Sequence, residues 1–172
     1  MADELGHRRV VTGRTPDGRS TVISDGPAPV TMQSDAFSLV ETWRIAGLPT
    51  DFGPEETVDG PAALDPAPGQ VLLRFCHFYP DSAGTDWEAA LGAIGGEEAY
   101  DPEAERPGVH ETDTLDHIVV MSGQIHLVLD EAEVVLNPGD TLVQRGTSHS
   151  WSNRSSIPCV VMTVQVKAQR TQ

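Results

Sequence analysis

Basic side chains are scarce in this 172-residue sequence: 11 Lys and Arg stand against 26 Asp and Glu, so the formal net charge is −15. Such a surface repels the phosphates of nucleic acids and of anionic lipid headgroups. Aromatic residues make up only 5% of the chain, too few for a base-stacking platform. We therefore expect a small-molecule ligand, and neither a nucleic acid nor a membrane, as the partner of this protein.

Cysteine is also rare, and long apolar runs are missing. The two cysteines, Cys76 and Cys159, lie far apart in apolar segments, which is typical of buried thiols in a reducing compartment. No stretch approaches the roughly 18 consecutive apolar residues of a membrane-spanning helix. Residues 1–10 contain no apolar core of a secretory signal. These absences predict a cytoplasmic protein.

Familiar catalytic motifs are missing as well. His110 begins the string HETDT, but Thr114 stands where a zinc-protease motif needs its second histidine. The sequence contains no phosphate-binding loop, no dinucleotide fingerprint and no G-x-S-x-G motif. Enzyme classes that depend on these motifs are therefore excluded.

Short runs rich in Val, Ile and Leu fill the second half of the chain, and Gly, Pro, Asn and Asp separate them. No helical pattern intervenes from residue 117 onward. This pattern predicts antiparallel strands in a sandwich or barrel. The expected strands span residues 117–122, 124–130, 133–136, 141–144, 149–153 and 159–166.

The first half of the chain is less regular. Extended pieces and turns alternate in residues 1–45, and residues 46–69 form a Pro-rich stretch that we expect to be a surface loop. A further strand is expected in 70–80, and Trp87, Leu91 and Ile94 have helical spacing that predicts one short helix near 85–94. The length fits one all-β domain over 1–172, with the barrel core in 70–167.

Three polar side chains are candidates for chemistry. His110 and Asp116 lie six residues apart, so they share one face of an extended segment, with Thr112 between them. His149 opens a later strand, and the three could converge if the strands are neighbours. Two imidazoles and one carboxylate are a ligand set for Fe(II), and also suit Mn or Zn. Ordinary core or surface histidines are the alternative.

Two further residues are candidate substrate contacts. Trp151 shares the face of His149 and could stack an unsaturated substrate or simply fill the core. Arg74 is the only basic residue of the 70–80 strand. If buried, it needs an anionic partner, which is either a substrate carboxylate or an internal ion pair.

Two sequence blocks resemble the conserved blocks of the cupin superfamily. The first runs His110-x-Thr112-x3-Asp116-x6-Gly123, and the second runs from Gly139-Asp140 through Gln144-x-Gly146-x2-His149-x3-Asn153. The order and spacing are similar to those of small single-domain cupins in bacterial and fungal secondary metabolism. The resemblance implies a jelly-roll barrel with extra N-terminal strands.

The resemblance also implies a site. His110 and His149 match ligand positions of the family, whereas Asp116 replaces a glutamate and Thr112 replaces a histidine. The implied metal site is therefore His110, Asp116 and His149 with Fe, Mn, Zn or Ni, and a metal-free pocket is the alternative. Gln144 replaces a proline of the family, and we expect it to face the pocket with Arg74 and Trp151.

The function implied by the resemblance is that of a lyase, a decarboxylase or dehydratase of a small aromatic or polyketide-like acid. His149, Asp116 and His110 would be its catalytic residues. An Fe(II)-dependent dioxygenase and a non-catalytic binding protein are the alternatives. Small cupins pair through N-terminal strands and sheet edges, so we also expect a homodimer in which RRVVT and STVIS take part.

Overall fold

A computed structural model describes residues 5–50 and 57–169 of the chain. Eleven strands, one α-helix and one short 3-10 turn make up the regular structure in these ranges. In chain order they are β1 (Arg8–Arg14), β2 (Ser20–Pro27), β3 (Val30–Gln33), β4 (Phe37–Ile45), β5 (Val71–Phe78), the 3-10 turn Asp81–Ala83, α1 (Trp87–Gly92), β6 (Thr114–Ser122), β7 (Ile125–Val128), β8 (Glu133–Leu136), β9 (Thr141–Gln144), β10 (Ser150–Ser152) and β11 (Cys159–Lys167).

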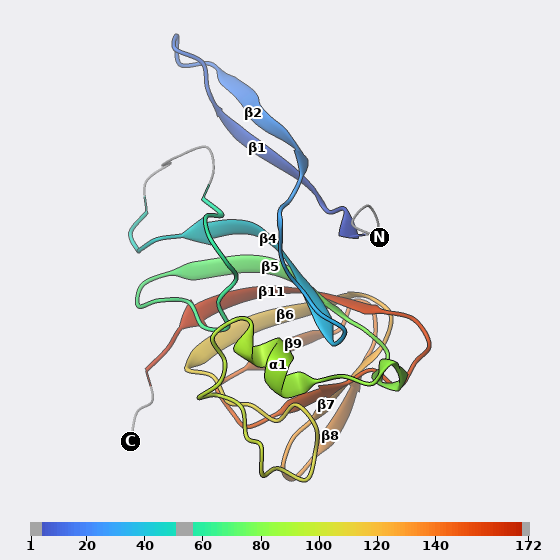
Figure 1. The fold of residues 1–172 in the computed structure, drawn as a ribbon. Helices are drawn as coiled ribbons and strands as arrows, with labels where there is room; N and C mark the ends of the chain where they lie inside the picture. The colour runs from blue at the N-terminus through green and yellow to red at the C-terminus, as the bar shows by residue number, and fades with distance from the viewer. Residues whose placement is uncertain (1–4, 51–56, 170–172) are drawn as a thin grey trace.

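The strands form three sheets in which every pair is antiparallel. A six-stranded sheet has the order β3-β4-β5-β11-β6-β9, and a three-stranded sheet has the order β10-β7-β8. Strands β1 and β2 pair only with each other and project away from the barrel (Figure 1). The predicted all-β fold with extra N-terminal strands and one short helix is confirmed.

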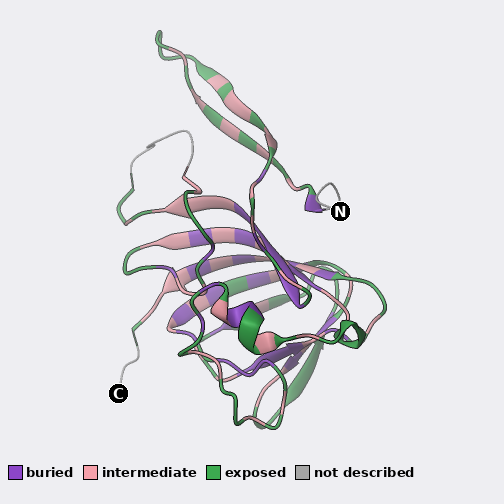
Figure 2. Cartoon of the chain, in the orientation of Figure 1, coloured by how far each residue is buried: buried purple, intermediate pink, exposed green. Residues whose placement is uncertain are grey.

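The core lies between the two larger sheets, because alternate apolar residues of their strands point inward. Ile118 and Val120 of β6, Val161 of β11 and Ile125 of β7 are buried in one cluster. Figure 2 shows buried residues on the barrel strands and on α1, whereas the β1–β2 hairpin has only intermediate and exposed residues. The barrel therefore contains the packed interior in which a site can form.

The first half of strand β4 does not alternate between buried and exposed residues. Residues 37–41 are all buried, because the N-terminal segment covers the outer face of the sheet there. Leu5 and Ala28 pack with Val40 on that outer face. A strand covered on both faces loses the alternation that sequence patterns detect.

The Pro-rich segment 46–69 is a surface loop only in part. Ala62 and Pro66 are buried, and the backbone N–H of Leu64 donates to the carbonyl of Ile94 over 2.7 Å. The apolar residues of this segment close one end of the barrel next to α1. Within the described ranges, no helix has the length and apolar character needed to cross a membrane.

Helix α1 covers the same end of the barrel. The Asp86 side chain caps it by accepting from the backbone N–H of Ala89 over 3.0 Å. Leu91 of the helix is buried in the barrel core. Gly108 allows Trp87 to pack closely, because a Cβ atom at Gly108 would lie 2.6 Å from the Trp87 ring. The short helix is thereby fixed as a cover over the interior.

Candidate functional site

A cavity of about 80 Å³ lies inside the barrel, several times the roughly 10–15 Å³ that one water molecule needs. Its apolar part comes from both sheets, from α1 and from the 46–69 segment. The polar residues that line it are Arg74, His110, Thr112, Asp116, His149, Thr163 and Gln165. The described structure thus brings His110, Asp116, His149, Arg74 and Trp151 to one cavity, as the sequence predicts.

His110 and His149 are direct neighbours although 39 positions separate them in the sequence. Each backbone N–H donates to the carbonyl of the other, over 3.0 and 3.1 Å. This two-residue bridge holds the ring centroids 4.4 Å apart. The predicted convergence of the two histidines is confirmed.

The backbone also fixes the orientation of both rings. Nδ1 of His110 donates to the carbonyl of Gly108 over 2.9 Å, and Nδ1 of His149 donates to the carbonyl of Thr147 over 2.8 Å. Because a carbonyl only accepts, the proton of each neutral ring is on Nδ1 and the lone pair is on Nε2. Each histidine therefore presents Nε2 as a base or a ligand atom.

Burial keeps both rings uncharged. Burial is the main cause, and the neighbouring His110 the second, of a shift that lowers the pKa of His149 from 6.5 to about 3. The pKa of His110 is lowered for the same reason, with the Gly108 hydrogen bond acting in the opposite direction. At neutral pH two unprotonated imidazoles therefore lie side by side in a largely apolar cavity.

Asp116 has the opposite electrostatic behaviour. It is buried on β6, and burial raises the pKa of its carboxyl group, although hydrogen bonds from Thr114 and Gln165 oppose the shift. Oδ2 accepts from the Gln165 amide over 3.3 Å, and Oδ1 has no hydrogen-bond partner within the described part of the chain. Burial thus disfavours the charged form of the Asp116 carboxyl group, which lines the same cavity as the two imidazoles.

The donor set does not fit a metal bound by three protein ligands. No three His, Cys, Asp or Glu side chains are grouped for such an ion in residues 5–50 and 57–169. Thr112 stands where cupins have a further histidine, and its hydroxyl forms a hydrogen bond of 2.8 Å with the Thr114 hydroxyl. Coordination of a metal by His110, Asp116 and His149 stays a prediction, and within the described ranges Asp116 is not grouped with the two histidines as a ligand.

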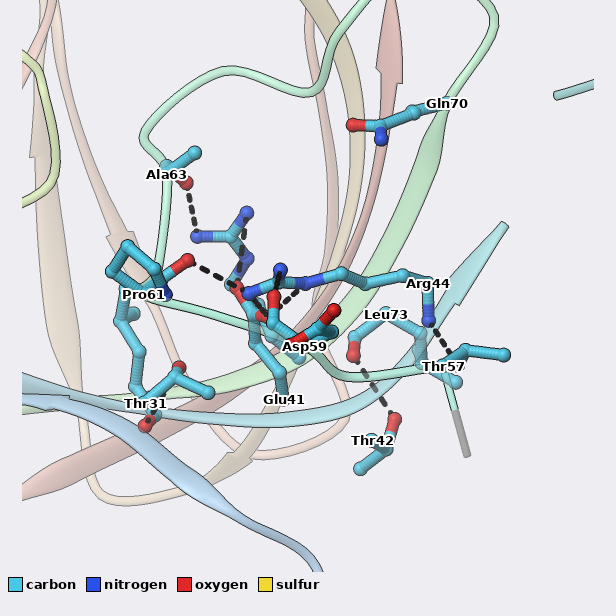
Figure 3. Close-up of polar contacts among 12 residues, drawn as sticks. Thr31, Glu41, Thr42, Arg44, Thr57, Asp59, Pro61, Ala63, Gln70 and Leu73 are labelled. Carbon is cyan, nitrogen blue, oxygen red and sulfur yellow. Dashed lines mark hydrogen bonds and ion pairs between the residues drawn. The ribbon is translucent and has the colours of Figure 1, made fainter. Parts of the chain in front are cut away.

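Arg74 lines the cavity from strand β5, and we call its surroundings the arginine end, as distinct from the histidine end around His110 and His149. Its side chain is 2% exposed and lies 3.7 Å from the fully buried carboxylate of Glu41. Glu41 is held more tightly by Arg44, whose Nε donates to Oε2 over 2.6 Å. Figure 3 shows Arg44 reaching across to the carbonyls of Asp59 and Pro61. Arg74 therefore has an internal anion nearby but does not form a close ion pair with it.

The two remaining predicted contacts have different roles. Trp151 lines the cavity and meets the His149 ring edge to face, with centroids 5.7 Å apart. Gln144 is buried opposite Asp116 in the sheet register but is not among the residues that line the cavity in the described structure. Its Oε1 accepts from the Thr147 hydroxyl over 2.7 Å, so Gln144 orders the turn whose carbonyl orients His149.

Sequence reasoning missed three polar residues of the interior: Glu41, Thr163 and Gln165. A signal for two of them exists in the run CVVMTVQV, where Cys159, Val161, Thr163 and Gln165 share one face of a strand. Polar residues on an otherwise apolar face indicate buried hydrogen bonding or a site. Glu41 gave the same kind of signal, because it follows Phe37 and Leu39 on one face of its strand.

Residues 96–165 match the family model described as a cupin domain. A phomopsin biosynthesis cluster protein of Diaporthe leptostromiformis is 51% identical over 55 residues, which are 29% of this chain and 29% of that protein. A cupin-domain-containing oxidoreductase of Aspergillus ruber is 42% identical over 55 residues, covering 31% of this chain and 27% of the relative. The matches thus span less than a third of these relatives.

Among solved structures, a cupin 2 conserved barrel domain protein of Salinispora arenicola is 15% identical, with a TM-score of 0.44 over 78% of this chain and 79% of that one. The match over 96–165 contains both sequence blocks and both cavity histidines. Residues 96–165 of this chain therefore contain a match to a cupin domain.

Proposed function

We propose that the protein is a lyase that removes water or carbon dioxide from a small organic acid bound in the barrel cavity. The observation that carries this proposal is the fixed His110–His149 pair, whose Nδ1 atoms are bound to backbone carbonyls. This arrangement leaves two Nε2 lone pairs as bases in a cavity that also contains the Asp116 carboxyl group. A base and an acid in one apolar site are the groups that elimination requires.

In the loss of water, Nε2 of His149 removes a proton from the carbon next to the carbonyl group of the substrate. The electron pair of that C–H bond forms the double bond, and the C–O bond to the neighbouring hydroxyl breaks. Asp116 gives its proton to the departing oxygen, which leaves as water. The proton on His149 then returns to Asp116, so the protein ends in its starting state.

The same groups support a decarboxylation. The bond between the carboxylate and its neighbouring carbon breaks, carbon dioxide leaves, and the electron pair stays on that carbon. Asp116 protonates the carbon, and a solvent proton restores Asp116. In both reactions the apolar surroundings strengthen the electrostatic interactions, because water is largely excluded.

The test is a screen of hydroxy and aromatic acids for a product that has lost water or carbon dioxide, detected by mass spectrometry. We expect turnover by the wild-type protein, and a loss of about 10²–10⁴-fold in the His149→Gln variant, the typical contribution of a general base. The His117→Gln variant is the matched control, because His117 is exposed on the outer face of β6. Full activity of His149→Gln would overturn the proposal.

A second candidate function is oxidation, which the Aspergillus ruber relative and a Neurospora crassa relative favour, since both are described as cupin-domain-containing oxidoreductases. An oxygenase consumes oxygen in step with substrate, whereas the proposed lyase consumes none. An oxygen electrode during turnover distinguishes the two. Saturable binding of acids with no product at all would instead favour a non-catalytic binding protein.

A further inference from the structure

The guanidinium group of Arg74 has two hydrogen-bond donors that the described residues leave unused. Nη1 donates to the carbonyl of Ala63 over 2.8 Å. Nε and Nη2 are buried and have no hydrogen-bond partner within the described residues. These two donors lie on the same edge of the guanidinium plane. This edge can bind a carboxylate through two parallel hydrogen bonds.

Arg74 has no close ion pair among the described residues. Oε2 of Glu41 accepts from Nε of Arg44 over 2.6 Å and lies 2.5 Å from its Nη2. Nη2 of Arg74 is 3.7 Å from Oε1 of Glu41, beyond hydrogen-bond length. Two guanidinium groups thus share one carboxylate. A buried cation without a close ion pair is costly, so a further anion would stabilise this part of the cavity.

A third unused donor lies beside Arg74. Thr163 of β11 pairs with Arg74 of β5 in the sheet register. Its hydroxyl is buried and has no hydrogen-bond partner in the described ranges. Both residues line the same cavity as His110 and His149. Nε and Nη2 of Arg74 and the hydroxyl of Thr163 together form a set of three donors on one side of this cavity.

We propose that Arg74 and Thr163 form a subsite for a carboxylate, with Nε and Nη2 of Arg74 holding its two oxygens and Thr163 donating a third hydrogen bond. The inference rests on the proposed function and names its substrate class. The ligand is a monocarboxylic acid, because Arg74 is the one Lys or Arg side chain that lines the cavity among the described residues. Its body is apolar or aromatic, to match Phe37, Phe78 and Trp151.

Two carboxyl groups of the protein compete with such a ligand for Arg74. Glu41 would have to move closer to make a hydrogen bond with Nη2, and its position is fixed by Arg44. Asp116 is held by Gln165 through Oδ2. Each carboxyl group is anchored through one oxygen, and its other oxygen, Oε1 of Glu41 or Oδ1 of Asp116, makes no hydrogen bond with any described residue, Arg74 included. The open edge of Arg74 therefore remains for a ligand.

The test compares aromatic and unsaturated monocarboxylic acids with their primary amides, which have nearly the same shape but no charge. Isothermal titration calorimetry measures each pair on the wild-type protein. We expect the tightest acid to bind at least about tenfold more tightly than its amide, since charge-assisted hydrogen bonds contribute about 1.5–3 kcal/mol. Equal affinity of acid and amide for every pair would overturn the proposal, and this comparison needs no variant.

Variants then locate the subsite. Arg74→Lys keeps the charge but removes the two-donor edge, so it should weaken acid binding about tenfold and leave amide binding unchanged. Thr163→Val should weaken acid binding a few-fold. The control is Arg154→Lys, since Arg154 is exposed and pairs with Glu133, and it should change neither. Unchanged acid binding in folded Arg74→Lys would overturn the proposal.

These experiments distinguish a failure of the proposed carboxylate subsite from a failure of the proposed lyase activity. Loss of the acid preference in Arg74→Lys without turnover by the wild type would support the carboxylate subsite and reject the lyase. Turnover of acids by a wild-type protein that binds acid and amide equally would support the lyase and reject the carboxylate subsite.

Discussion

The histidine end and the arginine end of the cavity are built in different ways. At the histidine end, both Nδ1 atoms donate to backbone carbonyls, and a two-residue bridge fixes the rings. At the arginine end, Nε and Nη2 of Arg74 and the hydroxyl of Thr163 have no hydrogen-bond partner among the described residues. The first end is organised before any ligand arrives, whereas the second end is completed by a ligand.

The largest expected effect is at the histidine end. His149→Ala removes the proposed base, and we predict a loss of about 10²–10⁴-fold in kcat with little change in KM for the acid, because Arg74 still binds it. Far-UV circular dichroism checks that the variant is folded. A change in KM with kcat preserved would reverse the roles that we give to the two ends.

The second largest expected effect is a loss of protein stability when the carboxylate at the arginine end is removed. Glu41→Gln removes the one carboxylate shared by Arg44 and Arg74, and we predict that the free energy of unfolding falls by about 3–5 kcal/mol. Urea denaturation measures this change. The control is Glu133→Gln, an exposed partner of Arg154, which should change stability little. An equal, small effect of both substitutions would show that the buried cluster is not electrostatically strained.

The pH dependence of stability tests the histidine end. The pKa of His149 is lowered from 6.5 to about 3, so the unfolded chain binds a proton more readily than the folded protein. This contribution to stability is complete above pH 6.5 and is lost as the pH falls toward 3. Asp116 acts in the opposite sense, because burial raises its pKa, and its contribution is lost as the pH rises.

We therefore predict that His149→Gln flattens the decline of the urea midpoint below pH 6.5. The exposed His117→Gln should keep the wild-type slope. His77, on the outer face of the sheet, adds a separate decline in stability at low pH, because burial lowers its pKa to about 4. An unchanged slope in His149→Gln would mean that the ring is hydrated and readily protonated in the folded protein.

The smallest expected effect is that of Thr163→Val on stability. Since the hydroxyl of Thr163 has no hydrogen-bond partner in the described structure, replacing it with a methyl group should change the free energy of unfolding by no more than about 1 kcal/mol. Urea denaturation without ligand measures this. A clear loss of stability would show that the hydroxyl serves the fold and not a ligand.

Much of the fold could be predicted from the sequence because strands and turns are local. The pattern in 117–166 predicted β6 to β11 to within three residues at each end, and the spacing of Trp87 and Leu91 predicted α1. His110 and His149 could be paired because their face follows from strand alternation and from the family blocks. What local patterns cannot show is which residues of different strands become neighbours.

The arginine end illustrates that limit. Arg74, Glu41 and Thr163 lie in three strands, and their proximity follows from the register of β4, β5 and β11. The role of Gln144 was also hidden, because a buried position on the inner face does not distinguish a cavity contact from a residue that orders a turn. Both features depend on tertiary packing.

Turnover without metal and without oxygen tests the central claim most directly. The wild-type protein is treated with a chelator, its metal content is checked by mass spectrometry, and its turnover of an identified acid is measured anaerobically. Our account predicts a product that has lost water or carbon dioxide, formed at the rate seen in air before metal removal. Turnover that stops under these conditions and returns with Fe(II) and oxygen would contradict it.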